Sequence, residues 1–262
     1  MSKAVRASAN NSNSFGLGWV PDLPDQRDLM YSAPYLVMKK LPPLVDLRSK
    51  CPPVYNQGHL GSCTANALGA AWEFGRKKQK LKDFMPSRLF VYYNERVMEK
   101  SVKSDNGAII RDGIKSLNDK GVCPEKEWPY IEEKFADTPP KKCFTDALKC
   151  AIKSYQRLTN TNLNQLQGCL SEGYPFVFGF TVYESFESET VAKTGMMPMP
   201  QSNEKVLGGH AVLSVGYDNK KQAMIVRNSW GHGWGDKGYF YMPYAYITNN
   251  NLCDDFWTIR IL

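Results

Sequence analysis

The chain contains the three residue types that perform thiol-based acyl transfer, at spacings that a fold can bring together. Cys63 follows Gly61 and Ser62 and opens a predicted helix. A helix N-terminus lowers the pKa of a thiol, because its unpaired N–H groups favour the thiolate. One of only three histidines, His210, follows Cys63 by 147 residues, and Asn228 follows 18 residues later. An imidazole can accept the thiol proton, and an asparagine oxygen can hold the second ring N–H.

Two further residues could complete such a site. Gln57 stands six residues before Cys63 and could donate its side-chain N–H to an oxyanion, together with the Cys63 backbone N–H. The indole of Trp230 could shield a bond between His210 and Asn228 from water. Taken alone, Cys63 is more simply a buried structural cysteine. The prediction of catalysis therefore depends on the combination of residue types.

Four short segments carry these residues: Gln57-Gly-His-Leu-Gly-Ser-Cys63, Gly209-His-Ala211, Asn228-Ser-Trp-Gly231 and Gly233-Trp-Gly-Asp-Lys-Gly-Tyr239. Together they resemble the papain-like (cathepsin-type) cysteine peptidases. Leu44-Val-Asp-Leu-Arg48 resembles the start of the mature enzyme in that family, and Glu127-Trp-Pro-Tyr130 its aromatic-Pro-Tyr element. The resemblance covers residues 42–262, which is most of the chain.

The resemblance implies a role for each candidate residue. Cys63 would be the nucleophile, His210 the general base and then acid, Asn228 the residue that orients His210, and Gln57 part of the oxyanion hole. The implied activity is peptide hydrolysis on protein or peptide substrates, without a metal or an organic cofactor. The implied fold is α+β, with a helical lobe, an antiparallel β-barrel-like lobe and the active site in the cleft between them.

The resemblance also implies where a substrate would lie. The candidate substrate-binding residues are Asn106, Gly107, Ala108, Gly209, Trp230, Asp254 and Asp255. The first three would offer backbone hydrogen bonds to an extended peptide. The last two stand where the family has the floor of the S2 pocket, and a carboxylate there would favour Arg or Lys at P2. The alternative is that they are solvent-facing carboxylates in a turn.

Three positions depart from the family pattern. Leu60 replaces one cysteine of the disulfide that usually braces the active-site loop, Thr64 replaces an aromatic residue, and Ala108 replaces a glycine. No histidine-containing insertion occurs between Cys63 and His210, so the clamp of cathepsin B-type enzymes is absent. We therefore expect an endopeptidase.

Hydrophobic periodicity predicts the elements that must position these residues. The 3.6-residue pattern predicts helices over 63–79, 86–99, 109–119 and 163–170. Alternating bulky residues predict strands over 175–183, 211–217, 223–227, 238–242 and 256–261. Residues 134–143 and 188–208 are predicted to be loops, the second of them long and mobile. Helices that precede strands favour an α+β fold with two lobes.

The chain divides near residue 41. Residues 1–14 are polar and predicted to be a disordered tail, while residues 15–40 mix aromatic residues and proline. The peptidase domain would span 41–262, with a helical lobe over about 56–155 and a β lobe over about 156–262 plus 41–55. Residues 15–40 could be a short autoinhibitory segment in the cleft. They could equally be a permanent strap on the back of a lobe.

Composition narrows the function further. Apolar residues make up 42% and charged residues 23% of the chain, the net charge is +7, and no apolar run approaches the 18 residues that a membrane span needs. The scattered basic residues favour no nucleic-acid site. Seven cysteines leave at least one thiol unpaired, and none lies in a CxxC pair. Without a secretory signal, a reducing compartment such as the cytoplasm is expected, and Cys123 with Cys143 is the only favoured pair.

Two other function classes remain as alternatives. One is a catalytically silent binding protein with the papain-like fold, although such proteins usually lose the cysteine or the histidine. The other is a different acyl-transfer enzyme on this fold, such as a transglutaminase-like or bile-salt-hydrolase-like enzyme. Transglutaminases normally have aspartate where Asn228 stands.

Overall fold

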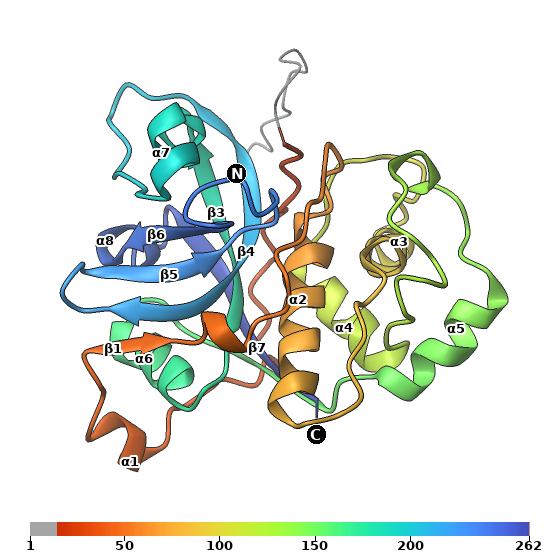
Figure 1. Cartoon of the computed structure of the whole chain (residues 1–262), viewed down its shortest axis with the longest axis horizontal. Helices are drawn as coiled ribbons and strands as arrows, with labels where there is room; N and C mark the ends of the chain where they lie inside the picture. Colours follow the sequence, from red (N-terminus) through yellow and green to blue (C-terminus); the bar gives the residue numbers. More distant parts are fainter. Residues whose placement is uncertain (1–14, 262) are drawn as a thin grey trace.

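A bundle of helices and an antiparallel sheet lie side by side as two lobes in this computed structural model (Figure 1). The structure describes residues 15–261, and the tail predicted for residues 1–14 lies outside the described residues. Within residues 15–261, no helix combines the length and the apolar character that crossing a membrane would require.

The helical lobe is built around one long helix that begins at the candidate nucleophile. Its helices are α2 (Cys63–Lys78), α3 (Arg88–Met98), α4 (Ile110–Asp119) and α5 (Lys141–Ala147), with short 3₁₀ turns at Glu132–Lys134 and Leu148–Cys150. Helix α2 packs on α3 and α4 on one side and on the sheet on the other. It is therefore buried from Cys63 to Phe74.

Local sequence explains where the neighbouring helices begin and which face they bury. The Ser87 hydroxyl accepts a hydrogen bond from the Phe90 N–H (3.2 Å) and so caps α3. Helix α4 buries Ile110, Ile114 and Leu117, which repeat at the spacing of one helix face.

The β lobe contains seven strands, and every pairing is antiparallel. They are β1 (Leu44–Asp46), β2 (Ser154–Arg157), β3 (Phe176–Tyr183), β4 (Val206–Asp218), β5 (Ala223–Arg227), β6 (Tyr239–Pro243) and β7 (Cys253–Arg260). Their order is β2-β7-β3-β4-β5-β6, and β1 pairs with β4. The long strand β4 is thus the centre of this lobe.

Short helices flank the sheet. They are α1 (Tyr35–Met38), α6 (Leu163–Ser171), α7 (Glu189–Thr194) and α8 (Tyr244–Ile247), with 3₁₀ turns at Arg48–Lys50 and Glu184–Glu187. The α+β fold with two lobes that the sequence predicts is confirmed.

The predicted helices and strands are present with shifts of a few residues, but the two predicted loops are partly wrong. Residues 134–143 end in helix α5, which begins at Lys141. Residues 188–208 include α7 and the first residues of β4. Ser188 caps α7 by accepting from the Val191 N–H (3.4 Å), and Gly195 ends it at a φ of +70°. These are short-range capping signals, which the hydrophobic pattern does not show.

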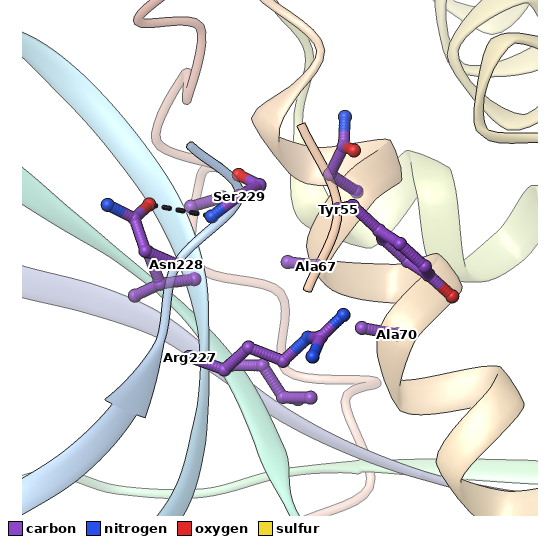
Figure 2. A pocket seen from close by; sticks show the side chains of 10 residues that line it. Tyr55, Ala67, Ala70, Arg227, Asn228 and Ser229 are labelled. Atoms are coloured by element: carbon purple, nitrogen blue, oxygen red, sulfur yellow. Dashed lines mark hydrogen bonds between the residues drawn. The ribbon is translucent and has the colours of Figure 1, made fainter. Parts of the chain in front are cut away.

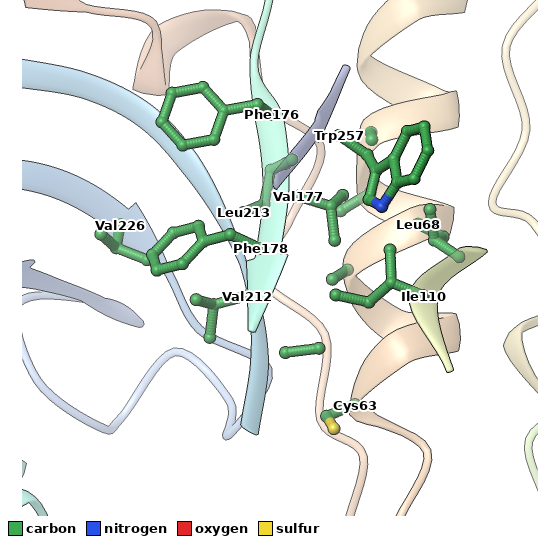
Figure 3. Close-up of a cluster of buried hydrophobic side chains, with 14 of the residues drawn as sticks. Cys63, Leu68, Ile110, Phe176, Val177, Phe178, Val212, Leu213, Val226 and Trp257 are labelled. Atoms are coloured by element: carbon green, nitrogen blue, oxygen red, sulfur yellow. The ribbon is translucent and has the colours of Figure 1, made fainter. Parts of the chain in front are cut away.

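The lobes meet in a continuous apolar core (Figure 3). Phe176 and Phe178 of β3 lie on the sheet side, and Leu68 of α2 lies on the helix side. Trp257 of β7 lies between them, and Cys63 stands at the edge of the same cluster. The candidate nucleophile is therefore attached to the most extensively packed part of the molecule.

The segment at 15–31 runs between the lobes rather than over the outside (Figure 1). It forms backbone hydrogen bonds to the loop before α2, to Ala108 in the loop before α4, to β4 and to β2. Residues that precede the predicted domain body therefore line the inter-lobe cleft.

We predict that Gly121→Ala destabilises the helical lobe. Gly121 has a φ of +70°, and a Cβ there would lie 1.9 Å from the carbonyl oxygen of Ala147. The expected loss is about 1–3 kcal/mol in the free energy of unfolding, measured by urea denaturation. Gly233→Ala is the matched control, because a Cβ at Gly233 meets nothing within 4 Å. Equal unfolding midpoints for the two variants would contradict the prediction.

Candidate active site

Cys63 is the first residue of α2, and its side chain is completely buried. The backbone N–H groups of Gly18 and Ala211 face its sulfur, so the thiol lies against the N-terminal segment and against the neighbour of His210. Burial raises the pKa of the Cys63 thiol to about 12. The thiol is therefore held in its neutral form.

His210 lies on β4 and is bonded to Asn228, which follows the last residue of β5. The His210 Nε2 is 2.8 Å from the Asn228 Oδ1, and β4 and β5 are neighbours in the sheet, which brings the two residues together. The His210 Nδ1 is buried and has no hydrogen-bond partner among residues 15–261. Burial lowers the pKa of His210 to about 4, so the imidazole is also held neutral.

The indole of Trp230 stacks on the His210 ring, with centroids 4.9 Å apart and planes 28° apart. Trp234 and Phe186 meet the other sides of Trp230 at centroid distances of 5.0 and 5.4 Å. This aromatic wall separates the bond between His210 and Asn228 from solvent. Such shielding was expected of Trp230.

A cavity of about 10 Å³ lies behind Asn228, between the sheet and α2 (Figure 2). Asn228 turns its Oδ1 back toward the chain and accepts a bond from the Ser229 N–H (2.8 Å). Tyr55, Ala67 and Ala70 form the wall on the α2 side. The space suits at most one water molecule and cannot hold a substrate.

Gln57 binds peptide carbonyl oxygens through its side-chain amide. Its Nε2 donates to the carbonyl oxygens of Gly16 and Leu60, both at 2.9 Å. Its Oε1 accepts from the Ser229 hydroxyl (2.6 Å), which fixes which end of the amide faces the cleft. Sequence reasoning missed Ser229, because its separation of 172 positions from Gln57 leaves no local signal.

Side chains from the helical lobe brace the Gln57–Cys63 loop. The Tyr130 hydroxyl contacts the Ser62 hydroxyl (2.5 Å) and donates to the Gln57 carbonyl oxygen (2.8 Å). Asp105 accepts from the Gly61 N–H (3.0 Å) and from the Tyr92 hydroxyl. These bonds stabilise the loop in which Leu60 replaces a cysteine of the disulfide expected from the family resemblance. Tyr130 was noted only as part of a motif, and Asp105 was missed.

Thr64 and Glu95 form a second contact behind the nucleophile. The Thr64 hydroxyl donates to the Glu95 Oε2 at 2.9 Å, in a site where Glu95 has no exposed surface. Burial raises the pKa of Glu95 well above its usual value. A polar pair thus occupies the place expected for an aromatic side chain.

The N-terminal segment pairs with both walls of the cleft. The Ala108 N–H donates to the Gly18 carbonyl oxygen (2.7 Å), and the Val20 N–H donates to the Ala108 carbonyl oxygen (3.0 Å). The Trp19 N–H donates to the Gly209 carbonyl oxygen (2.9 Å). Of the predicted substrate-binding residues, Ala108 and Gly209 therefore bind a peptide backbone, and this backbone is the chain's own.

The side chains of the segment fill the cleft at two further places. Phe15 stacks on Trp230 with centroids 4.7 Å apart. The Trp19 indole lies against Gly179, where a Cβ would be 1.9 Å from the ring, and its Nε1 donates to the Asp255 Oδ2 (2.9 Å). Gly107 contacts Gly18, because a Cβ on Gly107 would meet the Gly18 carbonyl oxygen at 2.0 Å.

The remaining predicted substrate-binding residues, Asp254, Asp255 and Asn106, differ in how deeply they are buried. Asp255 is completely buried with a φ of +58°, a conformation that a non-glycine residue rarely adopts. Burial and the nearby Asp22 carboxylate raise the pKa of Asp255. Asp254 is 53% exposed and bonds Arg157 (3.0 Å), so Asp255 is the member of the pair that lies against Trp19. Asn106 is exposed.

The cysteines other than Cys63 form no disulfide within residues 15–261. All seven are free thiols, and those of Cys123 and Cys143, the favoured pair, contact one another. With the Glu127 carboxylate, their ligand atoms lie within 4.8 Å of one another, the closest approach to a metal-ligand set that the described chain offers. Lys142 already bonds Glu127 at 2.6 Å.

Comparisons with known proteins agree with this geometry. The family model described as papain family cysteine protease matches residues 41–254. The chain belongs to the papain family. It is a cysteine peptidase.

Two individual proteins are similar to this papain-family chain over most of its length. It is similar to an uncharacterized peptidase C1-like protein of Acanthamoeba polyphaga mimivirus, with 46% identity over 213 residues, which are 78% of this chain and 68% of that protein. It is 29% identical to cysteine proteinase 1 of Entamoeba histolytica over 81% of this chain and 65% of that protein. The chain thus spans about two thirds of the length of these two relatives.

Solved structures agree as well. Xylellain, a cysteine protease from Xylella fastidiosa, superposes with a TM-score of 0.90 and 45% identity over 97% of this chain and 99% of that chain. Procathepsin L 3 of Tenebrio molitor has a TM-score of 0.68 at 22% identity over 89% and 74%, which supports the fold alone.

We predict that displacement of the N-terminal segment returns the pKa of His210 toward its usual value. In the wild type, His210 should titrate near pH 4, because the segment and the lobes desolvate it. In Trp19→Ala it should move toward 6.5. Because the chain has only three histidines, NMR of their ring protons can follow each one.

The lowered pKa of His210 also makes the stability of the closed form depend on pH. An imidazole with a lowered pKa stabilises the closed form above pH 6.5, and this contribution is lost as pH falls toward 4. An unchanged His210 titration in Trp19→Ala, with the other two histidines as internal references, would contradict the prediction.

Proposed function

We propose that Cys63, His210, Asn228 and Gln57 perform peptide-bond hydrolysis. His210 accepts the thiol proton at Nδ1, and the Cys63 sulfur bonds to the substrate carbonyl carbon. The Cys63 N–H and Gln57 Nε2 stabilise the oxyanion. His210 then donates the proton to the leaving amine, and afterwards activates the water that hydrolyses the thioester. Asn228 keeps the ring oriented throughout.

One observation carries this proposal. Gln57 Nε2 already holds the carbonyl oxygen of Gly16 while the Gly18 N–H faces the Cys63 sulfur, so these groups bind a peptide backbone. The unpartnered Nδ1 of His210 supports the role of proton acceptor. A silent binding protein would not require this free nitrogen, so hydrolysis is favoured.

We further propose that residues 15–31 inhibit the enzyme in the closed form. The segment occupies the oxyanion position, covers Cys63 and fills the Trp19 pocket, and its burial holds both Cys63 and His210 neutral. The bridge between Trp19 and Ala108 is parallel. A substrate that pairs antiparallel with Ala108 would run in the opposite direction, so the segment is bound without being a productive substrate.

For specificity, we propose a P2 pocket that takes a large side chain ending in a hydrogen-bond donor. Trp19 occupies this place with its N–H on Asp255, and Arg or Lys at P2 could donate to the same oxygen. We also propose endopeptidase activity, because the other two histidines, His59 and His232, both lie outside the stretch between Cys63 and His210. The seven free thiols support function in a reducing compartment.

We predict that Trp19→Ala opens the cleft to a thiol-directed probe. The substitution removes a buried indole, which typically stabilises a structure by about 3–5 kcal/mol, so the rate of Cys63 labelling should rise at least about tenfold. The probe is an epoxysuccinyl compound, and intact-mass spectrometry counts the adducts. Leu23→Ala is the matched control, because Leu23 lies on the same segment and is 83% exposed.

Each outcome of the Cys63 labelling experiment supports or overturns a stated part of the proposal. One adduct in Trp19→Ala that disappears with Cys63→Ala supports the proposed nucleophile and the inhibitory segment. Equal labelling of wild type, Trp19→Ala and Leu23→Ala would overturn the inhibition. Absence of any Cys63 adduct in all three would overturn the proposed mechanism.

We predict that Gln57→Ala in the Trp19→Ala background lowers kcat by about 10²-fold with a much smaller change in KM. The oxyanion contact strengthens in the transition state, and loss of one such donor has an effect of this size. A fluorogenic peptide with an aromatic P2 residue provides the assay, and thermal unfolding checks that the bond lost to Ser229 leaves the fold intact. A rise in KM with an unchanged kcat would show a binding role alone.

A further inference from the structure

Two arginines from opposite lobes converge on the same two carboxylates of the N-terminal segment. Arg111 is on α4 in the helical lobe, and Arg157 ends β2 in the β lobe. Arg111 reaches Asp28 (2.5 Å) and Asp22 (3.2 Å), and Arg157 reaches Asp22 (2.9 Å) and Asp28 (3.2 Å). The four side chains are at most 14% exposed, so this is a desolvated cluster rather than a surface ion pair.

The acceptors of the two guanidinium groups are unevenly distributed. Arg111 donates to the Leu23 carbonyl oxygen (2.7 Å) as well as to the two aspartates, and all three acceptors belong to the segment. Arg157 keeps Asp254 (3.0 Å) and Asp255 (3.1 Å) of β7 in addition. If the segment leaves the cleft, Arg111 therefore loses every one of these acceptors, and Arg157 loses two of its four.

The arginine pair adjoins the pocket that Trp19 fills. The Asp22 N–H donates to the Asp255 Oδ2 (3.0 Å), the same oxygen that accepts from the Trp19 indole. Both guanidinium groups lie over the ring of Trp257, at 5.6 and 5.4 Å from its centroid. The chain thus passes from the Trp19 pocket directly to the two arginines.

A desolvated guanidinium without an acceptor is costly, and a carboxylate matches its forked geometry. We propose that Arg111 and Arg157 form a subsite for an acidic side chain of the substrate, on the amino-terminal side of P2, and that Asp22 and Asp28 occupy this subsite in the closed form. This inference rests on the proposed function and assigns a substrate class to it. The two substrate features are then a donor-bearing P2 residue and an acidic residue at P3–P5.

The test uses the full chain with Asp22→Asn and Asp28→Asn combined, which removes the internal competitor and keeps the side-chain shape. Fluorogenic peptides with Trp at P2 carry Asp or Asn at P3, P4 or P5. At one of these positions, kcat/KM should be about tenfold or more higher for Asp than for Asn, as expected for a charge-assisted bond. The wild type should show weaker turnover, because its own aspartates compete.

Asp25→Asn is the matched control. Asp25 lies on the same segment, but its carboxylate accepts its hydrogen bonds from Arg27 of that segment. This variant should behave as the wild type in labelling and turnover. Faster Cys63 labelling in the Asp22→Asn, Asp28→Asn chain, together with no change in Asp25→Asn, supports the proposed occupancy; equal labelling of all three overturns it.

Arg111→Gln, added to the Asp22→Asn, Asp28→Asn chain, tests the subsite itself. The ratio of kcat/KM for the Asp and Asn peptides should fall to about one. If Arg111→Gln does not fold, Arg111→Lys retains the charge without the fork, and the ratio should fall at least about threefold. An unchanged ratio in the folded variant overturns the subsite.

Failure of the acidic subsite can be distinguished from failure of the proposed peptide hydrolysis. If the chain turns over peptides but does not distinguish Asp from Asn at any position, the subsite is wrong and the proposed hydrolysis stands. If Cys63 is neither labelled nor active in any variant, the proposed function has failed first.

Discussion

The packing of α2 against β4 is the constraint on which the site depends. Cys63 is the first residue of α2 and His210 lies on β4, so neither lobe holds both. Their relative position is set by the apolar core shared between the lobes, where Leu68 of α2 belongs to the same buried cluster as the side chains of β3 and β7 (Figure 3). A close-packed core resists small displacements, which keeps a two-lobed site in register.

Residues 15–31 lie in the cleft between the two lobes and bury the Cys63 thiol and the His210 imidazole. With residues 15–31 in place, the thiol and the imidazole are completely buried, and both neutral forms are favoured. A thiolate and an imidazolium need a polar or solvated surrounding to form. The contacts that fill the cleft are therefore also the contacts that disfavour the charged forms of Cys63 and His210.

The candidate reactive residues could be singled out from the sequence because their signals are local. Cys63 follows a glycine-rich turn and opens a helix, and Asn228 sits in a short aromatic and glycine motif. The strands and the longer helices follow from periodicity for the same reason. The pairs that complete the site have no such signal, since Arg157 and Asp22 are 135 residues apart, and Gln57 and Ser229 are 172 apart. Only the folded chain brings them together.

The position of the N-terminal segment was left open by its sequence, and its glycines explain how it fits. A Cβ at Gly16 would lie 2.1 Å from the Leu60 carbonyl oxygen, and one at Gly18 would lie 1.9 Å from that of Gly61. Only a backbone without side chains can approach the loop before Cys63 this closely. Trp19 then supplies the apolar contact, and Asp22 and Asp28 supply the charge. These contacts fit the segment to the cleft, and because it is tethered to the domain it binds without the translational cost of a separate chain.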